Sequence, residues 1–430
     1  MKEYSSYATK LETIAEKLLA DPTSAASLSK EIASALNGGP SKVLRKNVPI
    51  DDLKRTGTFF TGEHLIRFVS RSLHAGSPIN AALDPACGVG DLLLLASRSL
   101  PVFNDLRKTF GIWGNHLSGY DIHPEFVRTT KARLVLSAFN GKKLFKPAIG
   151  LSLVDLFPNI VTANGLDATA DYSSASRILM NPPFHKVSPP SGTEWAGGKV
   201  SAAAVFVEQC LLRAAAGTKV VAILPDVLRS GSLYTRWRTR IESLATVEKI
   251  EVFGQFDSLT DISVFVLSLT TRNTDVDPIH AAWWPDVSVK NESIEDYFDV
   301  CVGPVVPYRD PKKGPRYPYV QPKGLPRWKT ITETGENRRY SGTTIRGPFV
   351  VVRRNSRFED KHRAVATLVN MREQVAVENH LIVLKPKDGL LKTCKQLMKI
   401  LQRPETDTWL NDRIRCRHLT TSSVKALPWS

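Results

Sequence analysis

Residues 181–184 carry the most specific chemical signal in the sequence. They read Asn181, Pro182, Pro183 and Phe184, and they directly follow the apolar run 177–180. Because two prolines restrict the backbone, the Asn181 side-chain carbonyl and the Pro182 main-chain carbonyl can converge on one amino group. Two acceptors localise the lone pair of that nitrogen, and Phe184 offers a face for stacking an aromatic ring. Residues 181–184 are therefore the candidate catalytic residues, activating a planar amine for attack on a methyl sulfonium.

A second signal lies 97 residues upstream, where residues 84–91 read DPACGVGD between a predicted strand and a helical stretch. The small residues Ala86, Gly88 and Gly90 let a ligand approach the backbone closely, and a helix N-terminus offers free N–H groups. Ligands of open α/β sheets bind at turns of this kind. The sequence has neither a GxGxxG motif nor a Walker lysine here, which argues against dinucleotide and phosphate ligands.

Acidic residues end two further predicted strands. Asp121 and Ile122 follow the second strand, and Asp155 and Leu156 follow the third. A carboxylate at the end of the second strand can accept hydrogen bonds from both ribose hydroxyls. A carboxylate beside an apolar pair can bind an adenine amino group while the ring packs between side chains. Together with Asp84, these residues form the candidate cofactor site.

The elements that position these residues alternate along the chain. From about residue 56 to 270, short apolar runs alternate with helical patterns, which predicts an α/β fold with a doubly wound parallel sheet. The predicted strands are 81–83, 117–120, 148–153, 178–180, 220–224, 249–252 and 264–269. The predicted helices include 63–73, 125–138 and 202–215.

The chain is expected to have four consecutive parts. These are a helical leader over residues 1–50, the doubly wound domain over 51–272, a connector over 273–300 and a smaller basic α+β domain over 301–430. The last part contains 26 Lys and Arg against 11 Asp and Glu, so it carries +15 of the chain's net charge of +16. Such a charge predicts binding to a nucleic acid, and a basic domain with a solvated surface is the alternative.

The composition narrows the class of protein. With 42% hydrophobic and 23% charged residues, the chain is typical of a globular protein. The longest apolar runs, 92–96 and 220–224, fall far short of the ~20 residues that span a bilayer. The N-terminal residues lack the apolar core of a secretory signal. Five dispersed cysteines have neither disulfide nor metal spacing, so we expect a cytoplasmic protein with no metal centre and no membrane partner.

The order of motifs resembles that of the gamma-class adenine-N6 DNA methyltransferases, typified by the TaqI methyltransferase and also seen in type I modification subunits. The resemblance covers roughly residues 56–270 and implies a Rossmann-like domain, 51–272, that uses S-adenosyl-L-methionine as cofactor. It implies that Thr61 contacts the methionine end of the cofactor and that Asp84 holds its amino group. Asp121 then corresponds to the ribose-binding acid and Asp155 to the residue that reads the cofactor adenine.

The resemblance also implies a reaction. A methyl group would move from the cofactor to the exocyclic N6 amine of an adenine flipped out of duplex DNA, in a restriction-modification or phage-defence setting. Residues 181–184 match the family's catalytic tetrapeptide. Phe253 resembles a downstream aromatic residue that stacks, with Phe184, on the flipped base.

The basic part of the chain resembles a target-recognition domain of type I specificity subunits, on the strings at 345–354, 377–386 and 417–420. Phosphate contacts would position the duplex, and contacts to base edges would specify the site. The candidate DNA-binding residues are Arg353, Arg354, Arg413, Arg415 and Arg417. We expect double-stranded DNA as the partner, and any restriction or defence nuclease on a separate subunit.

Other functions stay open at this point. The same tetrapeptide serves methylation of cytosine N4, of an RNA base or of a protein glutamine. Outside the enzymes, the alternative is a catalytically silent DNA-binding or sensing subunit of a defence complex. The intact acids at positions 84, 121 and 155, together with Asn181, favour an active site.

Overall fold

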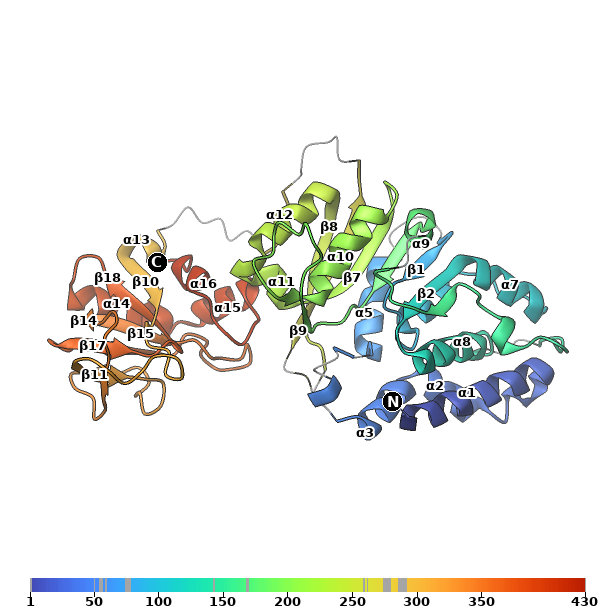
Figure 1. Cartoon of the computed structure of the whole chain (residues 1–430), viewed down its shortest axis with the longest axis horizontal. Helices are drawn as coiled ribbons and strands as arrows, with labels where there is room; N and C mark the ends of the chain where they lie inside the picture. Colours follow the sequence, from blue (N-terminus) through green and yellow to red (C-terminus); the bar gives the residue numbers. More distant parts are fainter. Residues whose placement is uncertain are drawn as a thin grey trace. The chain divides into compact units, whose positions relative to one another are not determined.

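The computed structural model describes residues 2–429 except 50, 54–56, 59, 74–78, 142–143, 168–169, 258–259, 261, 274–279 and 285–291. Phe59, two residues before the predicted site residue Thr61, therefore lies outside the described residues. The chain forms two compact units (Figure 1). The first unit comprises Met1–Leu228 and Thr235–Ala281, and the second comprises Arg229–Tyr234 and Ala282–Ser430.

A seven-stranded sheet forms the centre of the first unit, in the order β3-β2-β1-β4-β7-β9-β8. Its strands are β1 (Ala82–Asp84), β2 (Leu117–Asp121), β3 (Ile160–Thr162), β4 (Arg177–Met180), β7 (Lys219–Pro225), β8 (Ala245–Gln255) and β9 (Ser263–Thr271). The five strands from β3 to β7 are parallel, and β9 runs antiparallel to both β7 and β8. Because parallel strands end at one edge, the loops after β1, β2, β3 and β4 meet there.

Helices surround this sheet (Figure 1). They are α1 (Lys2–Ala20), η1 (Pro22–Ala25), α2 (Ser29–Leu36), α3 (Gly39–Asn47), α5 (Glu63–Leu73), α6 (Asp91–Ser97), α7 (Leu106–His116), α8 (Pro124–Ala138), η2 (Leu153–Asp155), α9 (Ala170–Ser174), α10 (Ala202–Arg213) and α12 (Thr235–Leu244). A small hairpin, β5 (Lys186–Val187) and β6 (Val200–Ser201), follows β4, while α11 (Asp226–Ser230) and η3 (Ser232–Tyr234) follow β7. None of the described helices is both long enough and apolar enough to cross a membrane.

The N-terminal helices pack against the sheet domain and share its core. Leu11, Ile14 and Leu18 recur on one face of α1 and are buried in the same cluster as residues of α6 and α8. The Arg128 Nε atom on α8 donates to Glu12 Oε1 on α1 at 2.7 Å. The predicted helical leader is thus part of the first unit.

The second unit contains two sheets and a helical layer. One sheet has five strands in the order β10-β18-β15-β16-β12, and the other has four in the order β13-β11-β17-β14. Successive side chains of β15 face two different core clusters. Val350 and Val352 of β15 face one core cluster with the helices, while Phe349 and Val351 face a second cluster with β17. The strands are β10 (Phe298–Val302), β11 (Arg316–Val320), β12 (Thr330–Ile331), β13 (Asn337–Arg339), β14 (Ile345–Arg346), β15 (Phe349–Arg353), β16 (Ala366–Val369), β17 (Gln374–Val377) and β18 (Leu381–Pro386). The helices are α13 (Ile294–Tyr297), α14 (Leu391–Leu401), α15 (Pro404–Arg413) and α16 (Thr421–Lys425).

One predicted strand is wrong. Residues 148–153 form no strand, since they are irregular up to Leu153, where η2 begins, and the third strand of the sheet is β3 at Ile160–Thr162. The true strand has only three residues, of which Val161 and Thr162 are exposed. Its apolar signal is therefore weaker than that of the irregular segment before it, whose Ala148 and Leu153 are buried in the core.

Candidate active site

The turn between β1 and α6 forms one wall of the candidate site. Ala86 and Gly88 line a cavity there, while Asp84 at the end of β1 lies beneath them with 1% of its surface exposed. The Ala86 N–H group donates to Asp84 Oδ1 at 3.1 Å. Burial raises the pKa of the Asp84 carboxyl to about 8, because the charged form loses its hydration. The turn therefore holds an acid that a nearby cation would ionise.

Asp121, the last residue of β2, continues this wall. Its Oδ2 atom accepts from the Gly88 N–H at 3.1 Å, and its Oδ1 atom accepts from the His123 N–H at 2.8 Å. Burial raises the pKa of Asp121 as well. Ile122 beside it lines the cavity and is 63% exposed, so an apolar side chain is available to a ligand.

The loop after β3 closes onto the turn after β1. Residues 163–166 line the cavity, and the Ala163 N–H donates to the Asp121 carbonyl at 3.0 Å. Gly165 packs directly on the backbone, since a Cβ atom there would lie 2.0 Å from the Pro85 carbonyl oxygen. Asn164 Oδ1 accepts from the Leu166 N–H at 3.2 Å, which shapes the loop. Asn164 and Leu166 therefore stand beside Asp121 and Ile122.

The loop after β3 lines the cavity, and the predicted third acid, Asp155, does not. Asp155 ends η2, before β3, and is exposed, while Leu156 is buried in the core. Neither residue lines the cavity. The expectation that Asp155 follows the third strand is wrong because β3 begins five residues later than Asp155. The residues that follow the third strand at the ligand-binding edge are Asn164 and Leu166.

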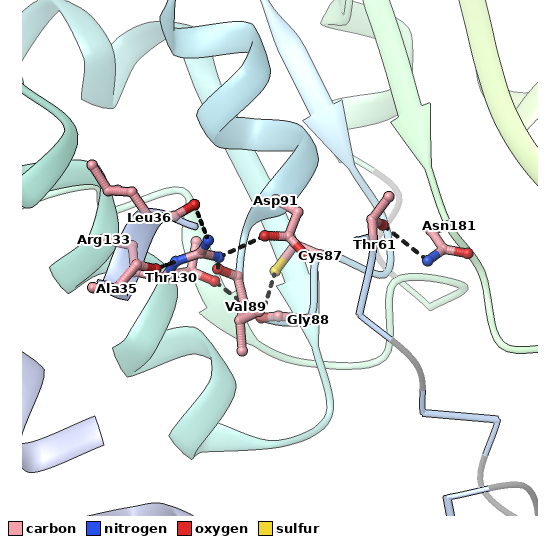
Figure 2. Close-up of polar contacts among 10 residues, drawn as sticks. All are labelled: Ala35, Leu36, Thr61, Cys87, Gly88, Val89, Asp91, Thr130, Arg133 and Asn181. Atoms are coloured by element: carbon pink, nitrogen blue, oxygen red, sulfur yellow. Dashed lines mark hydrogen bonds and ion pairs between the residues drawn. The ribbon is translucent and has the colours of Figure 1, made fainter. Parts of the chain in front are cut away.

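Asn181 follows β4 and reaches the same cavity. Its Nδ2 atom donates to the Thr61 hydroxyl oxygen at 3.0 Å, across 120 residues of sequence (Figure 2). Thr61 is 8% exposed. Pro183 lines the cavity beside Asn181, Pro182 is buried and Phe184 is half-buried. The segment before α5 thus contacts the tetrapeptide through the Thr61 hydroxyl.

The cavity has a volume of about 600 Å³ and joins both ends of the predicted chemistry. The predicted site residues that line it are Ala86, Gly88, Asp121, Ile122, Asn181 and Pro183. The predicted residues that do not are Thr61, Asp84, Gly90, Asp155, Leu156, Pro182, Phe184 and Phe253. Lining residues that the sequence analysis missed include Phe60, Phe126, Asn164, Leu166, His185 and Phe206. Among the described residues, His185 Nδ1 is buried without a hydrogen-bond partner.

A different aromatic residue from the predicted one contacts Phe184. Phe253 lies in β8 and packs edge-on against Phe68 of α5, with ring centroids 5.3 Å apart. Phe256, directly after β8, is 6% exposed and packs edge-on against Phe184 at 6.0 Å. The next residue, Asp257, forms an ion pair with Arg45 of α3. An N-terminal helix thus holds the segment that carries Phe256.

Arg133 of α8 connects the turn between β1 and α6 to the N-terminal helices (Figure 2). It is 1% exposed, and its Nε atom donates to the Ala35 carbonyl of α2 at 2.8 Å. Its Nη1 atom donates to the Val89 carbonyl and lies 2.9 Å from Asp91 Oδ1. Gly90, between these two contacts, has φ 82° and no room for a side chain, because a Cβ atom would lie 2.6 Å from Thr130 Cγ2.

The predicted DNA-binding arginines belong to the second unit and make contacts within it. Arg353 donates to the Leu325 carbonyl at 2.7 Å, and Arg354 donates to the Asn379 carbonyl at 3.0 Å. Arg413 lies over the Trp284 ring at 4.6 Å, and Arg415 donates to the Asn411 carbonyl at 3.3 Å. All four are partly buried, whereas Arg417 is exposed. In the described residues, no group of three His, Cys, Asp or Glu side chains is arranged for a metal ion.

Comparison with protein families supports the resemblance. Residues 43–241 match the family model described as N-6 DNA Methylase. This range contains every residue that lines the cavity. Comparison with the curated proteins finds no match.

Of three similar solved structures, the first shows the fold. The type IIL restriction-modification enzyme MmeI, solved in complex with DNA, has a TM-score of 0.58 at 12% identity, over 89% of this chain and 69% of that one. The type IIG restriction endonuclease BpuSI has a TM-score of 0.40 at 13% identity, over 84% of this chain and 57% of that one. A type I methyltransferase subunit from Streptococcus thermophilus has a TM-score of 0.35 at 18% identity, over 50% of this chain and 45% of that one. The predicted fold class, a doubly wound α/β sheet followed by a smaller α+β domain, is confirmed, and the second domain is rich in β-strands.

Proposed function

We propose that the protein is an S-adenosylmethionine-dependent DNA methyltransferase that modifies the N6 amine of an adenine flipped out of the duplex. The observation that carries the proposal is the shared cavity, which is lined both by Asn181 and Pro183 and by the turn residues Ala86 and Gly88. The family match over residues 43–241 supports adenine N6 as the target.

The residues around the cavity fit the proposed cofactor. Its volume of about 600 Å³ lies in the range of small-molecule sites. A ligand with ammonium and sulfonium charges would stabilise the ionised forms of Asp84 and Asp121, whose pKa values burial raises. His185 also lines the cavity, and its buried Nδ1 atom has no hydrogen-bond partner in the described part of the chain.

The adenosine part of the cofactor would lie along the ends of β2 and β3. Asp121 is the proposed acceptor for the ribose hydroxyls, as in other sheets of this type. Ile122, Leu166 and Phe206 offer apolar surface for the adenine ring. We assign Asn164, rather than Asp155, to the adenine edge, because it lines the cavity beside these three residues.

At the reacting end, the chain's own groups hold the amine. The Asn181 side-chain oxygen and the Pro182 main-chain carbonyl are the proposed acceptors for its two N–H groups, which keeps the nitrogen lone pair out of the ring. Phe184 is the proposed surface for the flipped base, and the buried Phe256 packs edge-on against it. When bound, S-adenosylmethionine supplies an electrophilic methyl group.

The proposal is tested by label transfer. The protein is incubated with S-adenosylmethionine carrying a tritiated methyl group and with unmethylated duplex DNA, and the product is digested to nucleosides. We expect label in N6-methyl-2′-deoxyadenosine with the wild type and with Asn104→Ala, an exposed asparagine of the same unit, and none with Asn181→Ala.

Two outcomes contradict it in different ways. Label in N4-methylcytosine would keep the fold and cofactor but overturn the target base. Absence of label, when both cofactor and DNA are shown to bind, would instead favour a silent DNA-binding subunit.

A further inference from the structure

A continuous surface of the second unit is built from segments far apart in sequence. We call it the loop face and define it as residues 303–316, 339, 354–355, 378–380 and 417–419. Backbone hydrogen bonds connect its parts in order: the Asn379 N–H donates to the Val305 carbonyl at 2.8 Å, and the Arg354 N–H donates to the His380 carbonyl at 3.0 Å. The Leu419 N–H donates in turn to the Arg354 carbonyl at 2.8 Å.

Hydrogen bonds from Arg338 and to Asp310 fix the shape of the loop at 306–315. Arg338 of β13 is 7% exposed, and its Nη2 atom donates to the Asp310 carbonyl at 2.7 Å and to the Pro307 carbonyl at 3.4 Å. Asp310 Oδ2 accepts from the Val306 N–H at 2.8 Å, and this bond lowers the pKa of Asp310. The loop therefore needs little ordering when it meets a partner, which reduces the entropic cost of binding.

The loop face is strongly cationic. It carries seven Lys and Arg residues and only two carboxylates, Asp310 and Glu378. Both carboxylates are used internally: Glu378 accepts from the Tyr319 hydroxyl at 2.8 Å and lies 2.8 Å from His380 Nδ1, and Asp310 pairs with Arg309. The exposed cations are Arg309, Lys312, Lys313, Arg316, Arg339 and Arg417.

Two of these cations repel each other. Arg316 of β11 stands directly opposite Arg339 of β13 in the antiparallel pair, and both are exposed. Like charges at such positions destabilise a sheet. A polyanion lying across the two strands would relieve this repulsion.

An aromatic side chain stands beside the cations. Tyr308 is 88% exposed and lies next to Arg309 in the loop at 306–315. Amphipathic aromatic side chains are enriched where proteins bind partners, because one end is apolar and the other polar. In contact with nucleic acid, such a ring stacks on bases or packs against sugars.

We propose that the loop face is the surface through which the second unit holds duplex DNA. Lys312, Lys313 and Arg316 contact phosphates, and Tyr308 contacts a sugar or base at the rim of a groove. This proposal rests on the proposed function for the identity of the polyanion. It replaces the partly buried arginines predicted from the sequence with exposed residues, and it retains Arg417.

A second basic surface provides the matched control. Helix α14 exposes Lys392, Lys395 and Lys399 and bears no acidic residue. It has cations but no exposed aromatic ring, no arginine and no preformed loop. If simple positive charge decided binding, α14 and the loop face would contribute alike.

The test compares two charge-matched double variants of the full chain. Binding of a fluorescent duplex is measured by anisotropy at several salt concentrations for Lys312→Gln/Lys313→Gln and for Lys392→Gln/Lys395→Gln. Each phosphate contact contributes about 0.9 to the slope of log K against log salt. We expect the loop variant to lose about 2 from the slope and to bind on the order of tenfold more weakly, with the α14 variant close to wild type.

Tyr308 gives a second readout. We expect Tyr308→Ala to weaken binding about fivefold or more at constant salt slope, and Tyr308→Phe to bind like the wild type, because stacking needs the ring and not the hydroxyl. An unchanged circular-dichroism spectrum and unchanged thermal unfolding of the full chain verify that each variant is folded.

Each other result overturns the proposal. Weaker binding by the α14 variant alone assigns the DNA to that helix, and equal loss in both variants assigns it to overall charge. No loss in either variant, or no binding by the wild type, removes the loop face as a DNA surface. Failure of the proposed function is recognised separately, as absence of methyl transfer by a wild-type protein that still binds DNA through the loop face.

Discussion

The Asn181 amide is held through its nitrogen, which donates to the Thr61 hydroxyl at 3.0 Å. An amide held in this way keeps its oxygen on the other side of the group, where the proposed reaction needs an acceptor. The resemblance assigned Thr61 to the methionine end of the cofactor. The observed contact predicts instead that Thr61 positions Asn181.

Replacing Thr61 tests that role. We expect Thr61→Val to lower kcat on the order of 10- to 100-fold, since small misplacements of a catalytic group cost rates of this size. Cofactor affinity should change less than threefold, and Thr61→Ser should restore kcat because it keeps the hydroxyl. A large loss of cofactor affinity in Thr61→Val with unchanged kcat would instead indicate that Thr61 contacts the methionine end of the cofactor.

Asp84 predicts a pH dependence of cofactor binding. Burial raises the pKa of this carboxyl to about 8, so the unliganded protein carries it protonated at neutral pH. A cationic ligand favours the ionised form, so binding releases a proton and affinity rises as pH increases from about 6 to about 8. Calorimetry in buffers of different ionisation enthalpy measures this proton. Asp84→Asn should bind more weakly and release none from this position.

The same shift predicts the sign of a stability change. The pKa of Asp84 is raised above its unfolded value, so its contribution to the unliganded protein is present at low pH and is lost as pH rises through about 8. Asp84→Asn should therefore lose less thermal stability than the wild type between pH 5 and about pH 9. An identical loss in both proteins would contradict the burial of this acid.

At the scale of elements, the loops after β1 and β3 meet backbone to backbone. We expect Gly165→Ala to weaken cofactor binding at least tenfold, because its Cβ atom would lie 2.0 Å from the Pro85 carbonyl and one loop must move. Gly197→Ala is the control, since a Cβ atom there meets nothing within 4 Å. Equal affinities for the two variants, measured by titration calorimetry, would contradict this account.

Helix α8 joins the N-terminal helices to the turn between β1 and α6. Two of its arginines allow a matched comparison, because one forms a buried ion pair and the other a surface ion pair. Arg133 is buried and pairs with the partly buried Asp91, and removing one partner of a buried pair costs about 3–5 kcal/mol. Arg128 pairs with Glu12 at the surface, where a pair contributes about 0–1 kcal/mol. Denaturant unfolding should thus show a large loss for Arg133→Gln and a small one for Arg128→Gln. Similar losses would mean that Arg133 is not essential to this connection.

Across the whole molecule, charge and cavity are divided between the two units. The cavity belongs to the first unit, whereas residues 301–430 carry +15 of the net charge of +16. DNA affinity should therefore fall by about 10³ or more between 50 and 200 mM salt, as for proteins with six or more phosphate contacts. Cofactor affinity should change little over the same range. A salt-independent Kd for DNA would exclude the basic unit as its main contact.

Local pattern predicted the elements whose residues are strongly periodic. The helix predicted over 63–73 is α5, and the strands predicted near 81–83, 117–120 and 178–180 are β1, β2 and β4. The residues at the ends of these strands, Asp84, Asp121 and Asn181, follow from that pattern. The third strand could not be found in this way, because β3 has three residues and two of them are exposed.

The sequence alone determined the parallel sheet, the chemistry at the ends of β1, β2 and β4, and the uneven distribution of charge. These depend on the order of residue types along short stretches, which burial and strand period impose directly. Only the tertiary structure decided that Asn164 stands where Asp155 was expected, that Phe256 rather than Phe253 contacts Phe184, and that Thr61 holds Asn181. Each of these is a contact between loops from different strands, and such contacts depend on how the strands pair in space rather than on any local pattern.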